Sequence, residues 1–174
     1  TYSEGEPETY VVPVRFVADE YAEQYLHEHP GAGMWRLAGR GEKGSSGVVC
    51  DAMADEGFTQ RLRGMMVGRR RQRDDGVELR GVATRHMAEV LNGDAATQFW
   101  PTTHRGEQSN STVFFADRLV LKLFRKSDAG LNPDWELSRF LTERAGFEHT
   151  PRALGAIELR DRRGEVRTLG VAHE

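Results

Sequence analysis

Two apolar-rich runs in the second half of the chain, Ser111 to Phe115 and Leu119 to Arg125, are separated by only three residues. Short runs rich in β-branched and aromatic residues around a tight turn predict a β-hairpin. The pattern repeats at "ALGAIELR", residues 153 to 160, and at "EVRTLGVA", residues 165 to 172, with the turn "DRRG" between them. This half of the chain is therefore expected to contain two β-hairpins.

One helix is expected between these hairpins. Asn132 is a favourable N-cap, and Pro133 follows at the first helical position, where the missing N–H of proline is harmless. Gly146 is expected to end the helix. Helical spacing predicts that its buried stripe consists of Leu137, Phe140 and Leu141.

The first half of the chain carries weaker signals. Residues 9 to 17 are rich in β-forming side chains, and residues 19 to 29 are weakly helical up to Pro30-Gly31. An amphipathic helix is predicted by four apolar residues at helical spacing: Phe58, Leu62, Met65 and Met66. The other expected elements are strands at 34 to 37 and 48 to 50, and a strand followed by a short helix between 77 and 92.

These patterns predict an α+β fold in two parts. Residues 1–95 would form an N-terminal cap subdomain, an antiparallel sheet with one or two helices. Residues 96–174 would form a lobe with a mostly antiparallel sheet and one helix. The junction is expected near residue 95, in the turn-rich stretch "LNGDAATQFWPTTHRGEQ".

Composition narrows the class of protein. The chain has 174 residues, of which 38% are hydrophobic and 29% are charged, as in a globular domain with a polar surface. It has no apolar run of membrane-spanning length and no secretory signal at its start, so a cytoplasmic protein is expected. Cys50 is the only cysteine, which excludes an intrachain disulfide and favours a small core residue over a reactive thiol.

The chain has a net charge of −3, but one stretch of it is strongly basic. The stretch "RLRGMMVGRRRQR", residues 61 to 73, carries six arginines and no acid. A solvated helix C-terminus, where the helix dipole favours cations, is the preferred interpretation. A nucleic-acid patch is the alternative, but the acidic net charge and the absence of interleaved aromatic residues argue against it.

The strongest candidate for chemistry is Lys122, which lies among Val120, Leu121, Leu123 and Phe124 in an apolar strand. A buried ammonium group needs a partner. Glu136, in the first turn of the helix that follows, could supply it. The strand is preceded by "RGEQSNST", whose small residues could present N–H groups and hydroxyls to phosphate oxygens. The structural alternative is a lysine that snorkels at a strand edge and a glutamate that favours a helix N-terminus.

A family resemblance extends this pattern. The stretch "GEQSNSTVFFADRLVLKLFRK", followed by "GLNPDWELSRFLTE", resembles the maltokinases, including the maltokinase-like domain fused to trehalose synthase. These enzymes are similar to aminoglycoside phosphotransferases and other small-molecule kinases with a protein-kinase-like fold. The resemblance is strong over about residues 100 to 174 and looser before them. It implies transfer of the ATP γ-phosphate to maltose, giving maltose 1-phosphate, with Mg²⁺ as the metal.

The resemblance also implies roles for individual residues. Gln108, Ser109, Asn110 and Ser111 would cover the phosphates. Lys122 would contact the α- and β-phosphates, and Glu136 would hold that lysine. His173 and Glu174 would begin the hinge segment that meets the adenine. The family's "HGD"-like catalytic loop and magnesium-binding acids lie beyond this hinge, so we expect the chain by itself to be inactive and its natural reading frame to extend further in both directions.

A non-enzymatic function is the main alternative. The cap could dock to trehalose synthase, fused or separate, or the chain could self-associate as a homodimer. The kinase interpretation requires a nucleotide contact at Lys122, whereas docking is indifferent to that residue. We also expect exposed apolar surface near Val113, Val120 and Val171, where the family's second lobe would cover the sheet.

Overall fold

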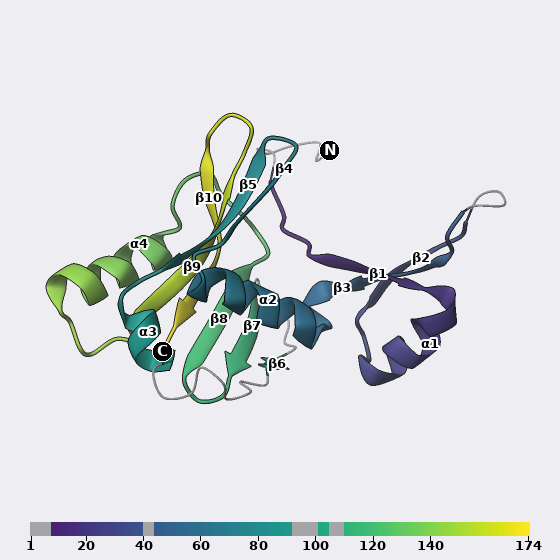
Figure 1. The fold of residues 1–174 in the computed structure, drawn as a ribbon, viewed down its shortest axis with the longest axis horizontal. Helices are drawn as coiled ribbons and strands as arrows, with labels where there is room; N and C mark the ends of the chain where they lie inside the picture. The colour runs from purple at the N-terminus through teal and green to yellow at the C-terminus, as the bar shows by residue number, and fades with distance from the viewer. Residues whose placement is uncertain (1–7, 40–43, 92–100, 105–109) are drawn as a thin grey trace. The chain divides into compact units, whose positions relative to one another are not determined.

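The computed structural model describes residues 8–39, 44–91, 101–104 and 110–174. The protein has an α+β fold, with two antiparallel sheets and helices packed beside them (Figure 1). The chain divides into two compact units. The smaller unit is Val12–Thr59, and the larger unit combines Thr1–Val11 with Gln60–Glu174.

The smaller unit is a three-stranded sheet covered by one helix. The strand order is β1 (Val14–Ala18), β3 (Gly47–Asp51), β2 (Gly33–Leu37), and α1 (Asp19–Glu28) follows β1 directly. One face of the sheet packs against α1 through Val17, Val48 and Cys50. Cys50 is fully buried, which confirms the prediction of a core cysteine. The short helix η1 (Ala52–Ala54) follows β3.

The arginine run of residues 61 to 73 is divided between a helix and a strand. Helix α2 (Glu56–Val67) ends before most of the arginines, and β4 (Arg71–Asp74) is an exposed edge strand paired with β5 (Val77–Ala83). The expected helix C-terminus is therefore confirmed, but the last arginines of the run belong to a hairpin that the charge pattern did not reveal.

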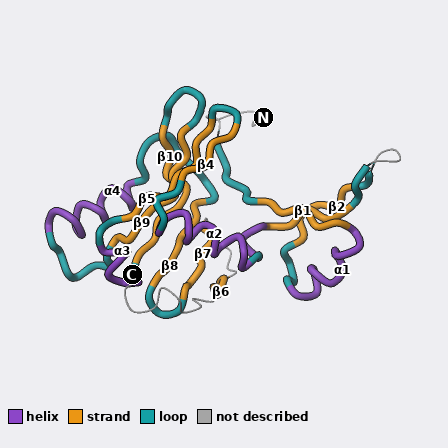
Figure 2. Tube along the Cα trace, in the orientation of Figure 1, coloured by secondary structure: helices purple, strands orange, loops and turns teal. Residues whose placement is uncertain are grey.

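The larger unit is built on a seven-stranded antiparallel sheet with the order β4-β5-β9-β10-β8-β7-β6. Its remaining strands are β6 (Pro101–His104), β7 (Asn110–Phe115), β8 (Leu119–Phe124), β9 (Ala153–Arg160) and β10 (Val166–His173). Figure 2 shows these strands side by side, with α3 (His86–Leu91) and α4 (Pro133–Phe140) beside them. Since β4 and β5 join this sheet through β9, the observed division of the chain differs from the boundary predicted near residue 95.

The two predicted hairpins are present, and they meet at the centre of the sheet. β7 and β8 are joined by a tight turn in which Ala116 has a φ of 50°. β9 and β10 form the second hairpin, and β10 also pairs with β8. Val113 and Val171 are fully buried and Val120 is half-buried, so the expectation of an exposed apolar surface is wrong at Val113 and Val171; Trp135 of α4 packs against Val171.

Helix α4 begins as the sequence predicts but buries a different face. The Asn132 side chain accepts a hydrogen bond from the Asp134 N–H, and Pro133 follows the cap. The helix continues as η2 (Leu141–Ala145), and Gly146 ends it with a φ of 60°. Trp135, not the expected Leu137 and Phe140, is the buried residue of α4. The larger indole packs among Phe124, Ala153, Ala156 and Val171, and this contact determines which face points inward.

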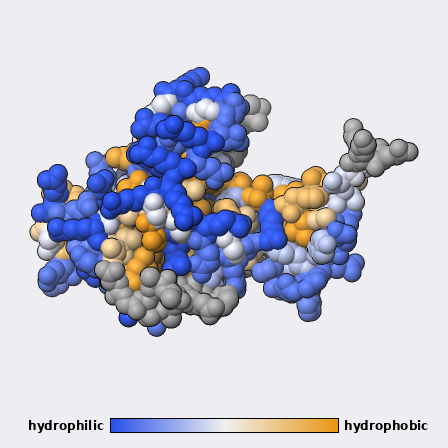
Figure 3. Space-filling view, viewed as in Figure 1, coloured by the Kyte–Doolittle hydropathy of each residue, from blue (hydrophilic) through white to orange (hydrophobic). Residues whose placement is uncertain are grey.

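Polar contacts join the β4–β5 hairpin at the edge of the sheet to the β9–β10 hairpin beside it. Arg80 of β5 and Glu158 of β9 lie directly opposite each other, and the Arg80 guanidinium donates to the buried carboxylate. Arg162, in the β9–β10 turn, pairs with Asp75 in the β4–β5 turn. Figure 3 shows a strongly hydrophilic surface over the outer ends of these hairpins.

Candidate functional site

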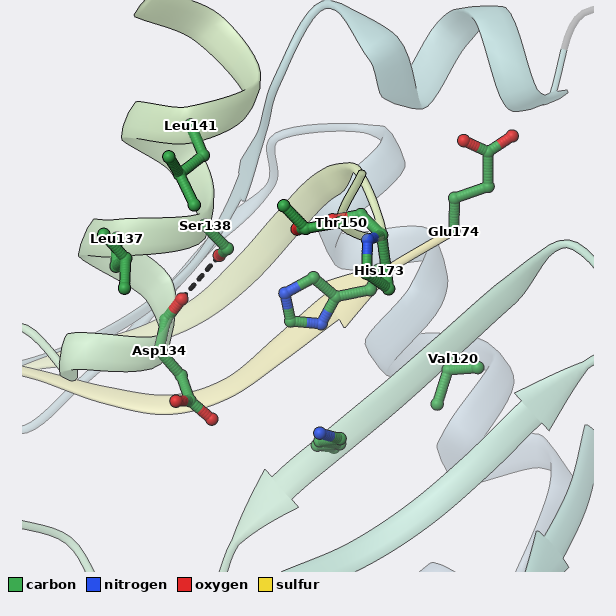
Figure 4. A pocket seen from close by; sticks show the side chains of 10 residues that line it. Val120, Asp134, Leu137, Ser138, Leu141, Thr150, His173 and Glu174 are labelled. Carbon is green, nitrogen blue, oxygen red and sulfur yellow. Dashed lines mark hydrogen bonds between the residues drawn. The ribbon is translucent and has the colours of Figure 1, made fainter. Parts of the chain in front are cut away.

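A pocket of about 390 Å³ lies between α4 and the strands β8 and β10. Figure 4 shows Asp134, Leu137 and Ser138 on one wall, with the His173 ring facing them. Lys122, His173 and Glu174, which the sequence predicts as site residues, all line this pocket. The complete wall consists of Val120, Lys122, Asp134, Leu137, Ser138, Leu141, Thr150, Pro151, His173 and Glu174.

The alternation of β8 brings Lys122 to the pocket. Leu121 and Leu123 point into the core and are at most 3% exposed. Val120 and Lys122 take the opposite face and are half-buried. In the adjacent strand, Lys122 lies opposite Val171, and Val120 lies opposite His173. The ammonium group and the imidazole therefore belong to neighbouring strands and share one side of the sheet.

Of the two acids in the first turn of α4, Asp134 lines this pocket and Glu136 does not. Glu136 is exposed, does not line the pocket, and makes no ion pair with Lys122 in the described part of the chain. Residues two positions apart on an α-helix differ in direction by about 200° around the helix axis. Asp134 and Glu136 therefore point to nearly opposite sides of α4. The predicted pairing of Lys122 with Glu136 is thus absent from the described residues, and Asp134 is the acid of α4 that lines the pocket together with Lys122.

The imidazole of His173 has a pKa below its ordinary value of 6.5, chiefly because it is buried. The positive charge of Lys122 lowers the His173 pKa further, whereas the negative charge of Asp134 raises it. The net result is a neutral imidazole at neutral pH, which has one N–H donor and one nitrogen acceptor.

The charges around His173 lead to a test by NMR titration. We expect Lys122→Met to raise the His173 pKa, because it removes a neighbouring positive charge, and Asp134→Asn to lower it. Glu136→Gln is the matched control and should leave the His173 pKa unchanged. An equal effect of Asp134→Asn and Glu136→Gln would contradict the observed orientation of α4.

The same depressed pKa links His173 to stability. Because the folded-state pKa of His173 is lowered, the unfolded chain binds a proton at this histidine more readily than the folded chain. The free energy of unfolding should therefore decrease as the pH falls below about 6.5, the ordinary histidine pKa.

Glu174 is held by a residue that the sequence interpretation missed. Arg152 binds the Glu174 carboxylate with two nitrogens, Nε and Nη2, and the Glu174 N–H donates to the Arg152 carbonyl at 3.0 Å. Arg152 also reaches Glu89 of α3, with Nη1 at 3.2 Å from the carboxylate. The hydrogen bond from Arg152 is the main reason that the Glu174 pKa is lowered. The arginine lies 22 residues away in the chain, so only strand pairing could reveal it.

The expected phosphate-covering loop is described only at its end. Gln108 and Ser109 lie outside the described residues. Asn110 and Ser111 begin β7 and are half-buried, but neither lines the pocket. The Ser111 hydroxyl accepts a hydrogen bond from Arg125 Nε at 2.8 Å. Thr112, the next residue in β7, is the one that lies opposite Lys122.

The described residues were expected to hold no metal ion by themselves, because the resemblance places the magnesium-binding acids beyond the hinge. No group of three or more His, Cys, Asp or Glu side chains in the described ranges could hold a metal ion. The pocket wall has two carboxylates, Asp134 and Glu174, and Arg152 already binds the second. No step is therefore assigned to a metal ion held by these residues.

Two further findings bear on the class of protein. Among the described segments, no helix has the length and apolar character needed to cross a membrane. No family model matches the chain.

Proposed function

We propose that this chain is the nucleotide-binding part of a maltokinase-like enzyme, which transfers the γ-phosphate of ATP to maltose. The observation that carries the proposal is that Lys122 of β8, His173 at the end of the neighbouring strand β10, and Glu174 directly after it line one pocket beside α4. Lys122 lies on the third strand of the series β6, β7, β8, and a helix and a hairpin follow it. Protein kinases also carry their ATP-binding lysine on the third strand of such a lobe.

The pocket has the chemistry that a nucleotide requires. The Lys122 ammonium can donate to phosphate oxygens as a point charge. Val120, Leu137 and Leu141 provide apolar surface for a base. The neutral His173, at the end of β10, can donate to or accept from a ring nitrogen. In this arrangement Asp134 takes the place expected of Glu136 as the acid near the lysine.

No catalytic base is assigned to any residue of the chain. We therefore expect the 174 residues to bind Mg-ATP without transferring phosphate to maltose. Binding is measured by isothermal titration calorimetry, and transfer by phosphorus NMR with the product of the complete reading frame. Transfer by that longer product would support the maltokinase assignment. Absence of Mg-ATP binding by the chain and of transfer by the longer product would overturn it.

The smaller unit supports a second candidate function, docking to another protein. The sheet face opposite α1 carries exposed apolar side chains, with Phe16 and Trp35 both paired to Val49 across the sheet. Figure 3 shows this apolar surface on the smaller unit. Such patches mark interaction sites. Trehalose synthase and a second copy of the chain are the proposed partners; light scattering would detect the second.

A further inference from the structure

A second pocket, of about 590 Å³, lies within the larger unit and away from Lys122. It is enclosed by the end of α2, the turn after it, the end of β5, and α3. Its wall consists of Arg63, Gly64, Val67, Gly68, Arg69, Arg70, Ala83, Thr84, Met87, Ala88 and Leu91. None of these eleven lining residues is acidic, and three are arginines.

The turn after α2 determines where two of the arginines lie. The Arg70 N–H donates to the Met65 carbonyl, and the Arg69 N–H donates to the Met66 carbonyl, which together form a Schellman motif. Arg69 occupies the left-handed position, with a φ of 46°, where glycine is usual. An L-residue in this conformation is uncommon, and such residues are concentrated at functional sites.

Arg63 contributes the third positive charge from within α2. It is only half-exposed, and its guanidinium lies 5.8 Å from the centre of the Phe115 ring. Burial lowers the pKa of Arg63, although an arginine keeps its charge in a protein. Arg63 is therefore more buried than Arg69 and Arg70, which follow the helix and are exposed.

The rest of the wall is mostly apolar. Val67 and Leu91 belong to α2 and α3, and Met87 is almost completely buried beneath them. The pocket wall thus combines three arginine side chains with an apolar surface, and Arg69 Nη2 donates to the Ala83 carbonyl at 3.4 Å. Guanidinium groups match the geometry of phosphate oxygens, and three positive charges suit a dianion better than a monoanion.

We propose that this pocket binds a phosphate monoester with an apolar organic group. Its guanidiniums take the phosphate and its apolar wall takes the organic part. The site is independent of the proposed ATP site, because the two pockets share no lining residue.

Phenyl phosphate is a suitable ligand for the test, since it joins a dianion to an apolar ring. It is titrated into the whole chain while the Met87 methyl and the arginine Nε–H signals are followed by NMR. Inorganic phosphate and benzyl alcohol each supply one half of the ligand. We expect phenyl phosphate to bind more tightly than either and to shift the signals of Arg63, Arg70 and Met87 together.

Two neighbouring arginines provide the matched variants. Arg70 lines the pocket, whereas Arg71 is exposed on β4 and does not. Arg70→Gln should weaken binding of phenyl phosphate about tenfold or more, because it removes a charged hydrogen-bond donor. Arg71→Gln, with the same loss of charge, should change it little.

Three outcomes would overturn the proposal. In the first, phenyl phosphate shifts none of the pocket signals. In the second, inorganic phosphate binds as tightly as the ester. In the third, Arg70→Gln and Arg71→Gln weaken binding equally; this would indicate a charged surface for polyanions, which a single-stranded oligonucleotide with steep salt dependence would then reveal.

Discussion

Replacing Lys122 by methionine is expected to weaken Mg-ATP binding about 10- to 100-fold and to leave the fold intact. Methionine keeps much of the length of the lysine side chain and removes its charge. The half-buried position beside Val120 accepts an apolar side chain, so the free energy of unfolding should change little. The loss of affinity would come from the missing ammonium donor to the phosphates.

Lys126→Met is the matched control for this variant. Lys126 lies beyond the end of β8, outside the pocket, and pairs with Glu8 at 2.6 Å. Calorimetry with Mg-ATP should distinguish the two variants, and thermal unfolding should show that both are folded. Equal affinity of Lys122→Met and the unchanged chain would remove the kinase interpretation and leave docking as the better one. In that case Lys122→Met should also leave the molar mass of the chain in solution, measured by light scattering, unchanged.

The second large effect is expected at Gly81, in β5. A Cβ atom at this position would lie 2.1 Å from the Met65 carbonyl oxygen and 2.6 Å from the Met66 nitrogen, both in the backbone of α2. Backbone atoms cannot rotate away as a side chain can. The Gly81 N–H also donates to the Arg70 carbonyl at 2.9 Å, which holds the strand against the turn. Gly81→Ala should therefore lower the free energy of unfolding by about 3 kcal/mol or more.

Gly64→Ala is the matched control and should have the opposite sign. Gly64 lies inside α2, and a Cβ atom there would meet nothing within 4 Å. Alanine in a helix is favoured over glycine by about 0.8 to 1 kcal/mol, so this variant should be more stable. Denaturation by urea measures both changes. A Gly81→Ala chain as stable as Gly64→Ala would show that β5 does not approach α2 as closely as the structure indicates.

Local signals were sufficient for the hairpins and for the start of α4. The runs around Ala116 and the turn "DRRG" specify antiparallel pairs, because a short connection permits little else. Asn132 and Pro133 cap the helix through contacts within three residues. The short helix α1 and the strands of the smaller unit follow in the same way from the pattern and the breakers around it.

The face of α4 was not specified locally. Leu137 and Phe140 have helical spacing, but each is more than half exposed, while Trp135 is 1% exposed. The face with Leu137 and Phe140 and the face with Trp135 both carry apolar side chains. Their spacing along the chain does not show which of the two faces is buried. The indole packs against Phe124, Ala153, Ala156 and Val171, which belong to three neighbouring strands of the sheet, β8, β9 and β10. The orientation of Asp134 and Glu136 follows from that choice.

Some residues of the candidate site could be predicted from the sequence, and others could be found only in the structure. Lys122 could be identified from the sequence because an ammonium group in an apolar strand is costly and therefore conspicuous. Its neighbours could not be derived from the residue pattern alone, since His173 reaches it through the pairing of β10 with β8, across about fifty residues of chain. The second pocket likewise depends on the approach of α3 and of the end of β5 to the end of α2, since its wall takes residues from all three.

The sequence by itself thus determined the elements, their caps and turns, and the residue whose charge requires a partner, because each of these depends on neighbours in the chain. Only the tertiary structure decided that Asp134, and not Glu136, lines the pocket with Lys122, that Arg152 holds Glu174, and that three arginines line a second pocket. These arrangements depend on strand register and on which helix face is buried, and both are set by packing between segments that are far apart in the sequence.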